Sequence, residues 1–429
     1  MRFFVIILLN LFSFFSISAE EDVKIFITKA LKNNLTLNAE RKNLDSVKQK
    51  KNITRSEFLP SITISGDQTS TSSTNRTDHN GLSLSDTELD SENKTILVEQ
   101  KIFSGFKGVN TFKKSELETQ KADLELKQVE QQTILNTVSV YFDLIYKFQN
   151  EKFNFLNVDL FERQVESDSA RLQKGEITLT DLAQSESSLA GANADLIKAK
   201  TEFLSSKTNF ERVTREKIPN FDNLKEMVVL ELPKSLNSSL KISNENNTNF
   251  LISKLDYEIS LRELNIERSR LSPSASIEVS KSENDDFSST IDDKDDETVK
   301  ATITWPLIKG GENISSIKKS SFDKQRAQLL LQDTKNKVST ETSNAWSKYQ
   351  SSKSVLEATL AQLKAAEIAN EGITLEYDSG SKRTTLEVIQ SRSLLLEARI
   401  AFAKAERDFM VSQFELAEQT GTLSLKSIY

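Results

Sequence analysis

The sequence contains no cysteine, one histidine, and only 11 glycines and 5 prolines among its 429 residues. Without cysteine the chain can form no disulfide, catalytic thiol or cysteine-ligated zinc or iron–sulfur centre. The single histidine, His79, lies among Ser, Thr, Asn and Asp residues and cannot make a histidine metal site. Few glycines and prolines mean few turns, which disfavours an α/β enzyme and indicates very long elements.

The chain also has no excess of positive charge, with 56 Lys and Arg against 63 Asp and Glu and a net charge of −7. This balance argues against a nucleic-acid partner. Only 37% of the residues are hydrophobic, which disfavours one large globular core. Carboxylates are abundant, but they lie in predicted loops or at helical spacing on solvated faces, without a cysteine or a glycine-rich phosphate loop beside them. We therefore expect neither catalysis nor a cofactor.

The first residues have the pattern of a secretory signal peptide. Met1-Arg2 gives a positive start, residues 3–17 are largely apolar, and Ser18-Ala19 offers small residues for cleavage. We therefore assign residues 1–19 as a signal peptide. A membrane anchor is the alternative, but the run is short for a span of about 20 residues. A lipid anchor is excluded because there is no cysteine to acylate.

The rest of the chain is an internal duplication, which a search for repeats finds first. Large apolar residues recur every seven residues in two segments that lie 206 positions apart, and small residues recur three positions after the first four of each segment. The larger set comprises Leu182, Leu189, Leu196, Phe203 and Phe210 against Val388, Leu395, Phe402, Phe409 and Leu416. The small set comprises Ser185, Ala192, Ala199 and Ser206 against Ser391, Ala398, Ala405 and Ser412. We expect a first repeat at 20–216, a linker or equatorial segment at 217–245 and a second repeat at 246–429.

Each repeat has the same expected order of elements. Helical segments at about 22–57 and 246–271 end before Pro60 and Pro273. Two alternating polar and apolar runs then predict two strands in each repeat, with polar loops at about 66–93 and 281–297 between them. The loop at 281–297 is rich in Asp, which suggests either a calcium site or, as we favour, a solvated loop, because it lacks EF-hand spacing.

A very long helix follows the strands in each repeat, at about 106–174 and 311–379. In the first of them an apolar seam has the 4-3-4-3 spacing of a coiled coil. The seam comprises Ile134, Val138, Tyr141, Ile145, Phe148 and Phe155. Gly175 and Gly380 then turn each long helix into a returning helix. The predicted fold is mainly α with β, built of long coiled-coil helices and four strands per chain.

Four amphipathic strands cannot close a barrel, which needs about eight strands, and open edges in a bilayer leave backbone groups unsatisfied. The strands must therefore close with those of other subunits, so we expect a cyclic homo-oligomer with helices extending from one barrel end. The alternative is a non-pore structural coiled-coil protein of the cell envelope, in which the strands form hairpins that build no barrel.

The sequence resembles the TolC family of trimeric outer-membrane efflux and secretion channels over nearly the whole mature chain. The resemblance is carried by Asn33-Asn34 with Leu59-Pro60-Ser61, by Ile102-Phe103-Ser104-Gly105 and by the two hairpins. It implies a homotrimer with a shared twelve-stranded β-barrel in outer-membrane lipid, and an α-helical barrel crossing the periplasm. It also implies a periplasmic adaptor (membrane fusion) protein and an inner-membrane pump or secretion ATPase as partners, with drugs, small molecules or proteins as passive cargo.

The resemblance further implies a gate at the two helical tips. Its residues in this chain are Thr180, Asp181, Tyr377, Arg383 and Glu387, with Glu387 as the carboxylate of a cation-favouring ring. Two departures from the family are that Arg383 lies one residue further from its glycine, and that Gln390 stands where a second acidic residue is common. The positions expected to contact the adaptor are Leu172, Gly175, Leu179 and Gly380. The alternative to a gate is an ordinary solvated helical hairpin whose charged residues face water and have no further role.

Overall fold

A computed structural model describes residues 23–217, 230–288, 290–379 and 383–428 of the chain. The chain divides into two compact units, each of which draws on both sequence repeats. Unit 1 comprises Met1–Asn38, Val129–Asn247 and Ser339–Tyr429, and unit 2 comprises Ala39–Gln128 and Thr248–Val338. The expected signal peptide lies outside the described residues, as does the part of the expected linker at 218–229.

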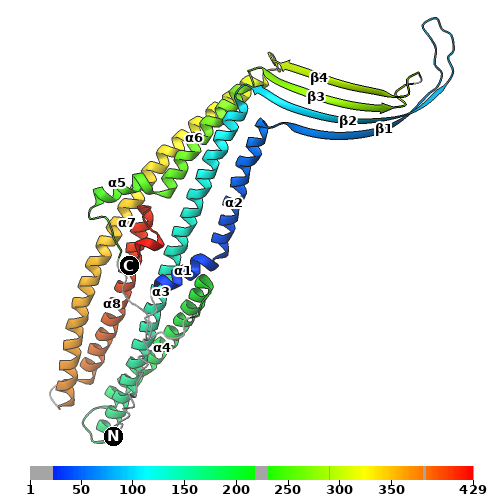
Figure 1. The fold of residues 1–429 in the computed structure, drawn as a ribbon. Helices are drawn as coiled ribbons and strands as arrows, with labels where there is room; N and C mark the ends of the chain where they lie inside the picture. Colours follow the sequence, from blue (N-terminus) through cyan, green and yellow to red (C-terminus); the bar gives the residue numbers. More distant parts are fainter. Residues whose placement is uncertain (1–22, 218–229, 289, 380–382, 429) are drawn as a thin grey trace, which may run out of the picture. The chain divides into compact units, whose positions relative to one another are not determined.

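The elements follow the predicted order in both repeats (Figure 1). The first repeat contains α1 (Val23–Asn33), α2 (Leu35–Arg55), η1 (Ser56–Phe58), β1 (Ser61–Ser73), β2 (Thr87–Ser104), α3 (Lys107–Gln173) and α4 (Leu179–Thr214). The second contains α5 (Leu236–Asn246), α6 (Thr248–Ser269), β3 (Ser274–Asp285), β4 (Lys294–Thr304), α7 (Glu312–Asp378), α8 (Thr385–Gln419) and η2 (Leu425–Ser427). Most of α5 occupies the segment expected to be linker.

The first helical segment is two helices, whereas the sequence predicted one continuous helix at 22–57. The break falls at Asn34, whose side-chain Oδ1 accepts a hydrogen bond of 3.0 Å from the backbone N–H of Leu37. An asparagine that bonds the backbone in this way starts a new helix. The second repeat breaks at the corresponding residue, Asn247, between α5 and α6.

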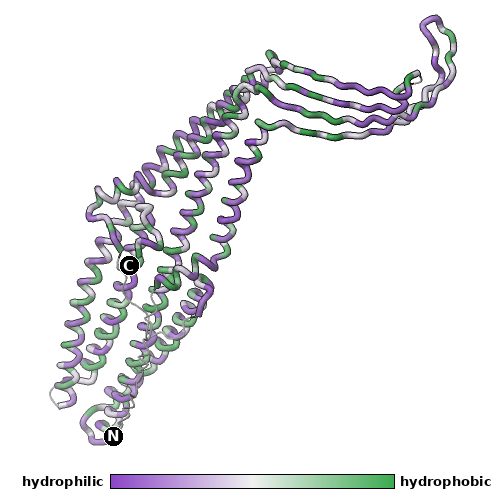
Figure 2. The backbone as a smooth tube through the Cα atoms, viewed as in Figure 1, coloured by the Kyte–Doolittle hydropathy of each residue, from purple (hydrophilic) through white to green (hydrophobic). Residues whose placement is uncertain are grey.

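Unit 2 contains one antiparallel sheet in which the strands lie side by side in the order β1-β2-β3-β4 (Figure 1). The register places like residues on the same face of neighbouring strands. One row crosses the sheet as Ile62, Val98, Val279 and Val299, and the adjacent row on the other face as Ser61, Glu99, Glu278 and Lys300. Figure 2 shows the same alternation as colours that change along the strands. The sheet therefore has one apolar and one polar face.

The loops between paired strands are shorter than the sequence predicted. β1 runs to Ser73 and β2 begins at Thr87, so most of the expected loop at 66–93 is strand. Likewise β3 runs to Asp285 and β4 begins at Lys294, within the expected loop at 281–297. Ladder pairs such as Gly66 with Lys94 satisfy the backbone of these polar segments, which lack the apolar alternation used to find strands.

The two long helices, α3 and α7, have 67 residues each, in agreement with the sequence prediction. Most of the predicted seam of α3 is buried in unit 1, with Val138 and Tyr141 at 0% exposure. Phe155 is the exception, because it is 57% exposed. Beyond Phe148 the positions buried within the chain include Asn154 and Asn157.

The main core of unit 1 joins the two repeats. It packs residues of α1, α3, α4 and α8 with the C-terminal segment, including Phe26, Tyr141, Phe210, Phe414 and Ile428. The predicted small residues of α4 and α8 are all buried, which lets neighbouring helices approach closely. Across the described helices we find none that is both long and apolar enough to span a membrane.

Candidate functional site at the helical tips of unit 1

The first tip joins α3 to α4 through a glycine in the left-handed conformation. Gly175 has a φ of 73°, and the N–H of Glu176 donates to the carbonyl of Arg171 at 3.0 Å. These are features of a Schellman helix end, in which glycine carries little strain. Of the expected adaptor contacts, Leu179 is 71% exposed and Leu172 is half-buried. The fourth, Gly380, lies outside the described residues.

Both returning helices begin with the same capping arrangement. Thr178 caps α4 by accepting from the N–H of Asp181, whose carboxylate accepts from the Thr178 N–H at 2.8 Å. Thr384 and Glu387 repeat this at the start of α8, again at 2.8 Å. Asp181 and Glu387, the two acidic residues expected at the gate, are thus the third helical residues of two capping boxes. The hydrogen bonds from Thr178 lower the pKa of Asp181.

Arg383 bonds within the second hairpin. Its guanidinium lies 2.6 Å from a carboxylate oxygen of Glu376 and 3.0 Å from one of Glu387. The pKa of Glu387 is lowered, first by the backbone N–H of Thr384 and next by Arg383. The Arg383 side chain therefore links the end of α7 to the beginning of α8.

Tyr377 lies in a buried polar cluster between the two hairpins, which we call the Asp168 cluster. Its members are Gln164 and Asp168 of α3, Ser185 of α4, Tyr377 of α7 and Thr385 of α8, all of them buried. The Tyr377 hydroxyl donates to Asp168 Oδ1 at 2.8 Å, and Ser185 donates to Asp168 Oδ2 at 2.6 Å. Gln164 Nε2 also donates to Oδ1, at 2.9 Å. Residues of α3, α4 and α7 thereby meet at one carboxylate, and Thr385 of α8 joins the cluster through the Tyr377 hydroxyl.

Two arginines lie beside the cluster. The Arg171 guanidinium is 4.4 Å from the centre of the Tyr377 ring, a cation–π distance. Burial is the main cause of the raised pKa of Tyr377, so its hydroxyl stays protonated and can donate. Burial also lowers the pKa of Arg392, which donates to the carbonyl of Leu160 in α3 at 3.2 Å.

The predicted gate residues are therefore only partly brought together within one chain. Arg383 and Glu387 are paired, whereas Tyr377 bonds to Asp168 and Thr385, at 3.0 Å for the latter. Asp181 bonds to Thr178, and Thr180 is exposed beside it. Tyr377 and Arg383 thus bond to residues other than Thr180 and Asp181.

The α3 residues of the cluster were not predicted from the sequence, although the sequence contains a signal for them. Asn154, Asn157, Phe161, Gln164 and Asp168 follow one another at spacings of three and four residues, and all are buried. A search for apolar seams overlooks such a row, because four of its five members are polar. The helix seam thus continues to the tip, but as a polar one.

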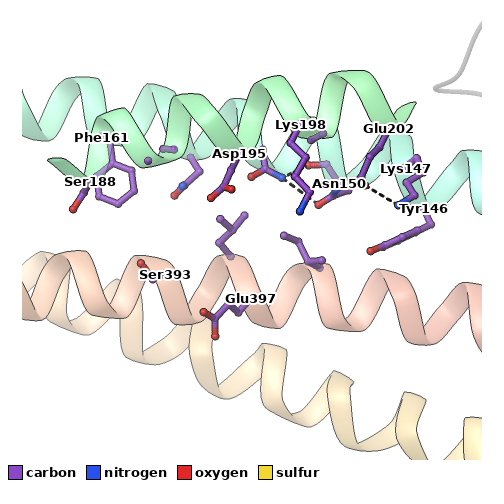
Figure 3. A pocket seen from close by; sticks show the side chains of 17 residues that line it. Tyr146, Lys147, Asn150, Phe161, Ser188, Asp195, Lys198, Glu202, Ser393 and Glu397 are labelled. Atoms are coloured by element: carbon purple, nitrogen blue, oxygen red, sulfur yellow. Dashed lines mark hydrogen bonds and ion pairs between the residues drawn. The ribbon is translucent and has the colours of Figure 1, made fainter. Parts of the chain in front are cut away.

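A groove of about 590 Å³ runs beside this polar seam, between α3 and α4 on one side and α8 on the other (Figure 3). Tyr146, Lys147 and Asn150 of α3 line it opposite Ser393 and Glu397 of α8. Lys147 pairs with Glu202 of α4 at 2.7 Å. The groove lies next to a buried apolar cluster that contains Phe161 and Ala192 of its lining together with Ile389 of α8.

The acidic segment at 281–297 was considered as a calcium site. Residue 289 lies outside the described residues. Over the described ranges no group of three or more Asp, Glu or His side chains is arranged to hold a metal ion. Some carboxylates of the segment 281–297 pair with lysines instead, as Asp296 does with Lys294 at 2.8 Å.

Comparison with known proteins places this geometry in a family context. Residues 26–214 and 241–422 match the family model described as "Outer membrane efflux protein". The chain is similar to the outer membrane efflux protein BepC of Brucella suis, with 26% identity across 93% of this chain and 85% of BepC. It is also similar to the outer membrane protein TolC of Escherichia coli, with 21% identity across 98% of this chain and 86% of TolC.

Solved structures share the fold. The outer membrane channel CmeC of Campylobacter jejuni has a TM-score of 0.81 at 16% identity, covering 93% of this chain and 85% of CmeC. The open state of the MtrE outer membrane channel of Neisseria gonorrhoeae has a TM-score of 0.75 at 14% identity, covering 94% of this chain and 91% of MtrE.

Proposed function

The chain belongs to the outer membrane efflux protein family and is an outer-membrane efflux channel, and from this premise we propose that it is a gated exit duct built from three copies. In this proposal cargo leaves the cell passively through the duct. The chain supplies a conduit and no chemistry, so it is not an enzyme. Residues 1–19 would direct export and be removed, leaving the mature protein in the outer membrane and the periplasm.

The observation that carries the proposal is the two-faced sheet of unit 2. Its apolar face exposes Ile64, Val299 and Ile303 at 76%, 76% and 78%, which suits a lipid environment better than water. The outer strands β1 and β4 end the sheet, and their open edges would be costly in a bilayer. Closure with two further copies would give a twelve-stranded barrel with its polar face inside.

The gate in this proposal is the pair of helical tips. Thr180, Asp181, Tyr377, Arg383 and Glu387 would hold the tips closed and line the opening. The Asp168 cluster supports this, because it connects both hairpins through one carboxylate next to the tips. The beginning of α8 would move when the Arg383 contacts break, and Glu387 would face the pore as one of three carboxylates.

Docking would occur on the same tips. Leu172, Gly175, Leu179 and Gly380 would contact a periplasmic adaptor protein, which would link the channel to an inner-membrane pump or a secretion ATPase. Leu179 supports this assignment, since a leucine that is 71% exposed at a helix start gains apolar burial when a partner covers it.

Planar lipid bilayer recordings on the purified protein test the duct. We expect small conductance from the wild type, and a several-fold larger one after Asp181→Ala with Arg383→Ala, because the tip contacts are lost. Arg163→Ala is the matched control, since Arg163 pairs with Asp159 in an exposed i,i+4 contact of α3. No conductance from either protein would contradict the duct and favour a structural envelope protein. Gel electrophoresis in detergent tests the assembly separately, and we expect it to show trimers that resist the detergent.

A further inference from the structure

Unit 2 contains a second cavity that the proposed function does not use. It has a volume of about 630 Å³ and lies where β2 passes into α3 and α6 passes into β3. Side chains from β2, β3, β4, α6 and the starts of α3 and α7 line it. A cavity of this size accommodates a small organic molecule.

Three lysines line this cavity without an ionic partner. Lys101, Lys107 and Lys309 form no ion pair with any residue of the described ranges. Other basic groups nearby are already paired: Lys300 lies 3.5 Å from Glu278, and Arg270 lies 2.8 Å from Glu267. Three like charges on the walls of one cavity repel each other, and a bound anion would relieve that repulsion.

Hydroxyl groups stand beside one of these lysines. The register of the sheet puts Lys101, Ser276 and Thr302 in one row across β2, β3 and β4, on the polar face. Thr302 Oγ1 is buried and has no hydrogen-bond partner among the described atoms. Buried polar atoms are nearly always bonded, so this hydroxyl is suited to donate to a ligand in the cavity.

The net charge of the lining limits which class of ligand the cavity can bind. Arg270 also lines the cavity but is paired with Glu267 and Glu312. The three unpaired lysines face Glu57 and Glu99 in the lining, which leaves an excess of one positive charge. A small anion therefore suits the lining, whereas a large polyanion would also meet the two glutamates. A phosphate monoester carries a charge of about −1.5 to −2 near neutral pH and has three strong acceptor oxygens.

The apolar residues of the lining indicate that the bound anion carries an organic group. Phe103, Ile266 and Pro306 add apolar surface to the cavity. The strand residues Ser276 and Thr302 lie on the polar face of the sheet, opposite the apolar face that contains Val279 and Val299. Phe103 and Ala275 also line the cavity and lie in the row of Ile303 on the apolar face. The phosphate group could therefore belong to a solute from water or to a lipid headgroup, and the experiment below distinguishes these two sources.

We propose that this cavity is a binding site for small organic phosphates of the monoester class, with Lys101, Lys107, Lys309 and Thr302 contacting the phosphate group. The lysines supply charge, as lysine does in other phosphate sites, and Thr302 donates a hydrogen bond. The site would let the channel hold an anionic solute on the polar side of its sheet.

Isothermal titration of the full-length protein in detergent with phenyl phosphate tests the site without requiring a conducting channel. We expect phenyl phosphate to bind and phenol not to bind. Lys101→Gln or Lys309→Gln should weaken binding about tenfold, the loss of one charge-assisted contact. Thr302→Val should weaken it about fivefold without changing charge. Lys300→Gln is the matched control and should change binding less than twofold, because Lys300 is paired with Glu278.

Absence of binding by the wild type would overturn the proposal. An equal loss in Lys300→Gln and Lys101→Gln would also overturn it, since it would show a general surface charge effect. Mixed micelles with phosphatidic acid test the lipid source. We expect them to displace phenyl phosphate no better than inorganic phosphate does, and stronger displacement would assign the cavity to lipid instead. Circular dichroism and trimer mobility on a gel confirm that each variant is folded and assembled.

Discussion

Asp168 has no exposed surface and accepts hydrogen bonds from Gln164, Ser185 and Tyr377. A buried carboxylate is tolerated when its oxygens are bonded, and removing it leaves the donors without an acceptor. The residue therefore stabilises the contact between hairpins.

Asp168→Ala should destabilise unit 1 by about 2–4 kcal/mol, because three buried donors lose their acceptor. Thermal unfolding in detergent measures the loss, and trypsin cleavage near the tips should become faster. Asp159→Ala is the control, since the exposed Asp159–Arg163 pair should contribute less than about 1 kcal/mol. Equal effects of the two substitutions would contradict the role of the Asp168 cluster.

Two glycines have nearly the same left-handed φ but different surroundings. Gly421 has a φ of 71°, and a Cβ added there would lie 2.1 Å from the carbonyl oxygen of Asn246. Gly175 has a φ of 73° with open space around it.

Gly175→Ala should therefore cost only the conformational strain of about 1 kcal/mol. Gly421→Ala should cost about 3 kcal/mol, because backbone must also move. Comparing the thermal midpoints of the two variants with wild type measures the difference. Equal midpoints would show that Asn246 moves aside at no cost.

Glu387 should make the second tip sensitive to acid. A carboxylate whose pKa is lowered by folding stabilises the folded state above its ordinary pKa, and this contribution is lost as pH falls through the folded pKa. The midpoint of wild type should thus exceed that of Glu387→Gln at pH 7. The difference should shrink as pH falls below about 4.3, the ordinary pKa of glutamate, and disappear below the lowered folded pKa. Glu371→Gln, at an exposed position of α7, is the control. A difference that persists in acid would contradict the capping role.

The returning helix α4 packs through small residues. Ala192 is 5% exposed and belongs to a cluster with Val158, Phe161, Leu196 and Ile389. This cluster connects α3, α4 and α8, so its volume sets the separation of the helices.

Ala192→Leu should destabilise the protein by about 1–3 kcal/mol through overpacking. Ala190→Leu, two residues earlier on the exposed side of the same helix, should change stability by less than about 0.5 kcal/mol. Thermal unfolding of both variants makes the comparison. A larger effect at residue 190 would indicate that a partner covers that face.

For the whole assembly, the two faces of the sheet should tolerate charge differently. Val299→Lys on the apolar face should reduce assembled trimer in outer-membrane fractions, with a cost of up to about 2–4 kcal/mol. Thr298→Lys, the adjacent residue on the polar face, should assemble as the wild type does. Gel mobility of unheated samples measures the trimer fraction. Equal assembly would argue against a lipid-facing surface.

Features that depend on local spacing were predictable from the sequence. The duplication, both 67-residue helices, the turning Gly175 and the strand starts after Pro60 and Pro273 follow from periodicity and turn residues that are near each other in the chain. The polar halves of β1 and β2 were missed because strand pairing, not apolar alternation, satisfies their backbone.

Contacts between distant residues were decided only by the tertiary structure. The sequence pointed to Tyr377 as a tip residue, but its acceptor is Asp168, which is 209 positions away. Likewise, the row of Lys101, Ser276 and Thr302 exists only because three strands pair in one register. Periodicity indicates which face of an element a residue occupies. The partner that this face meets depends on long-range packing, which leaves no local pattern in the chain.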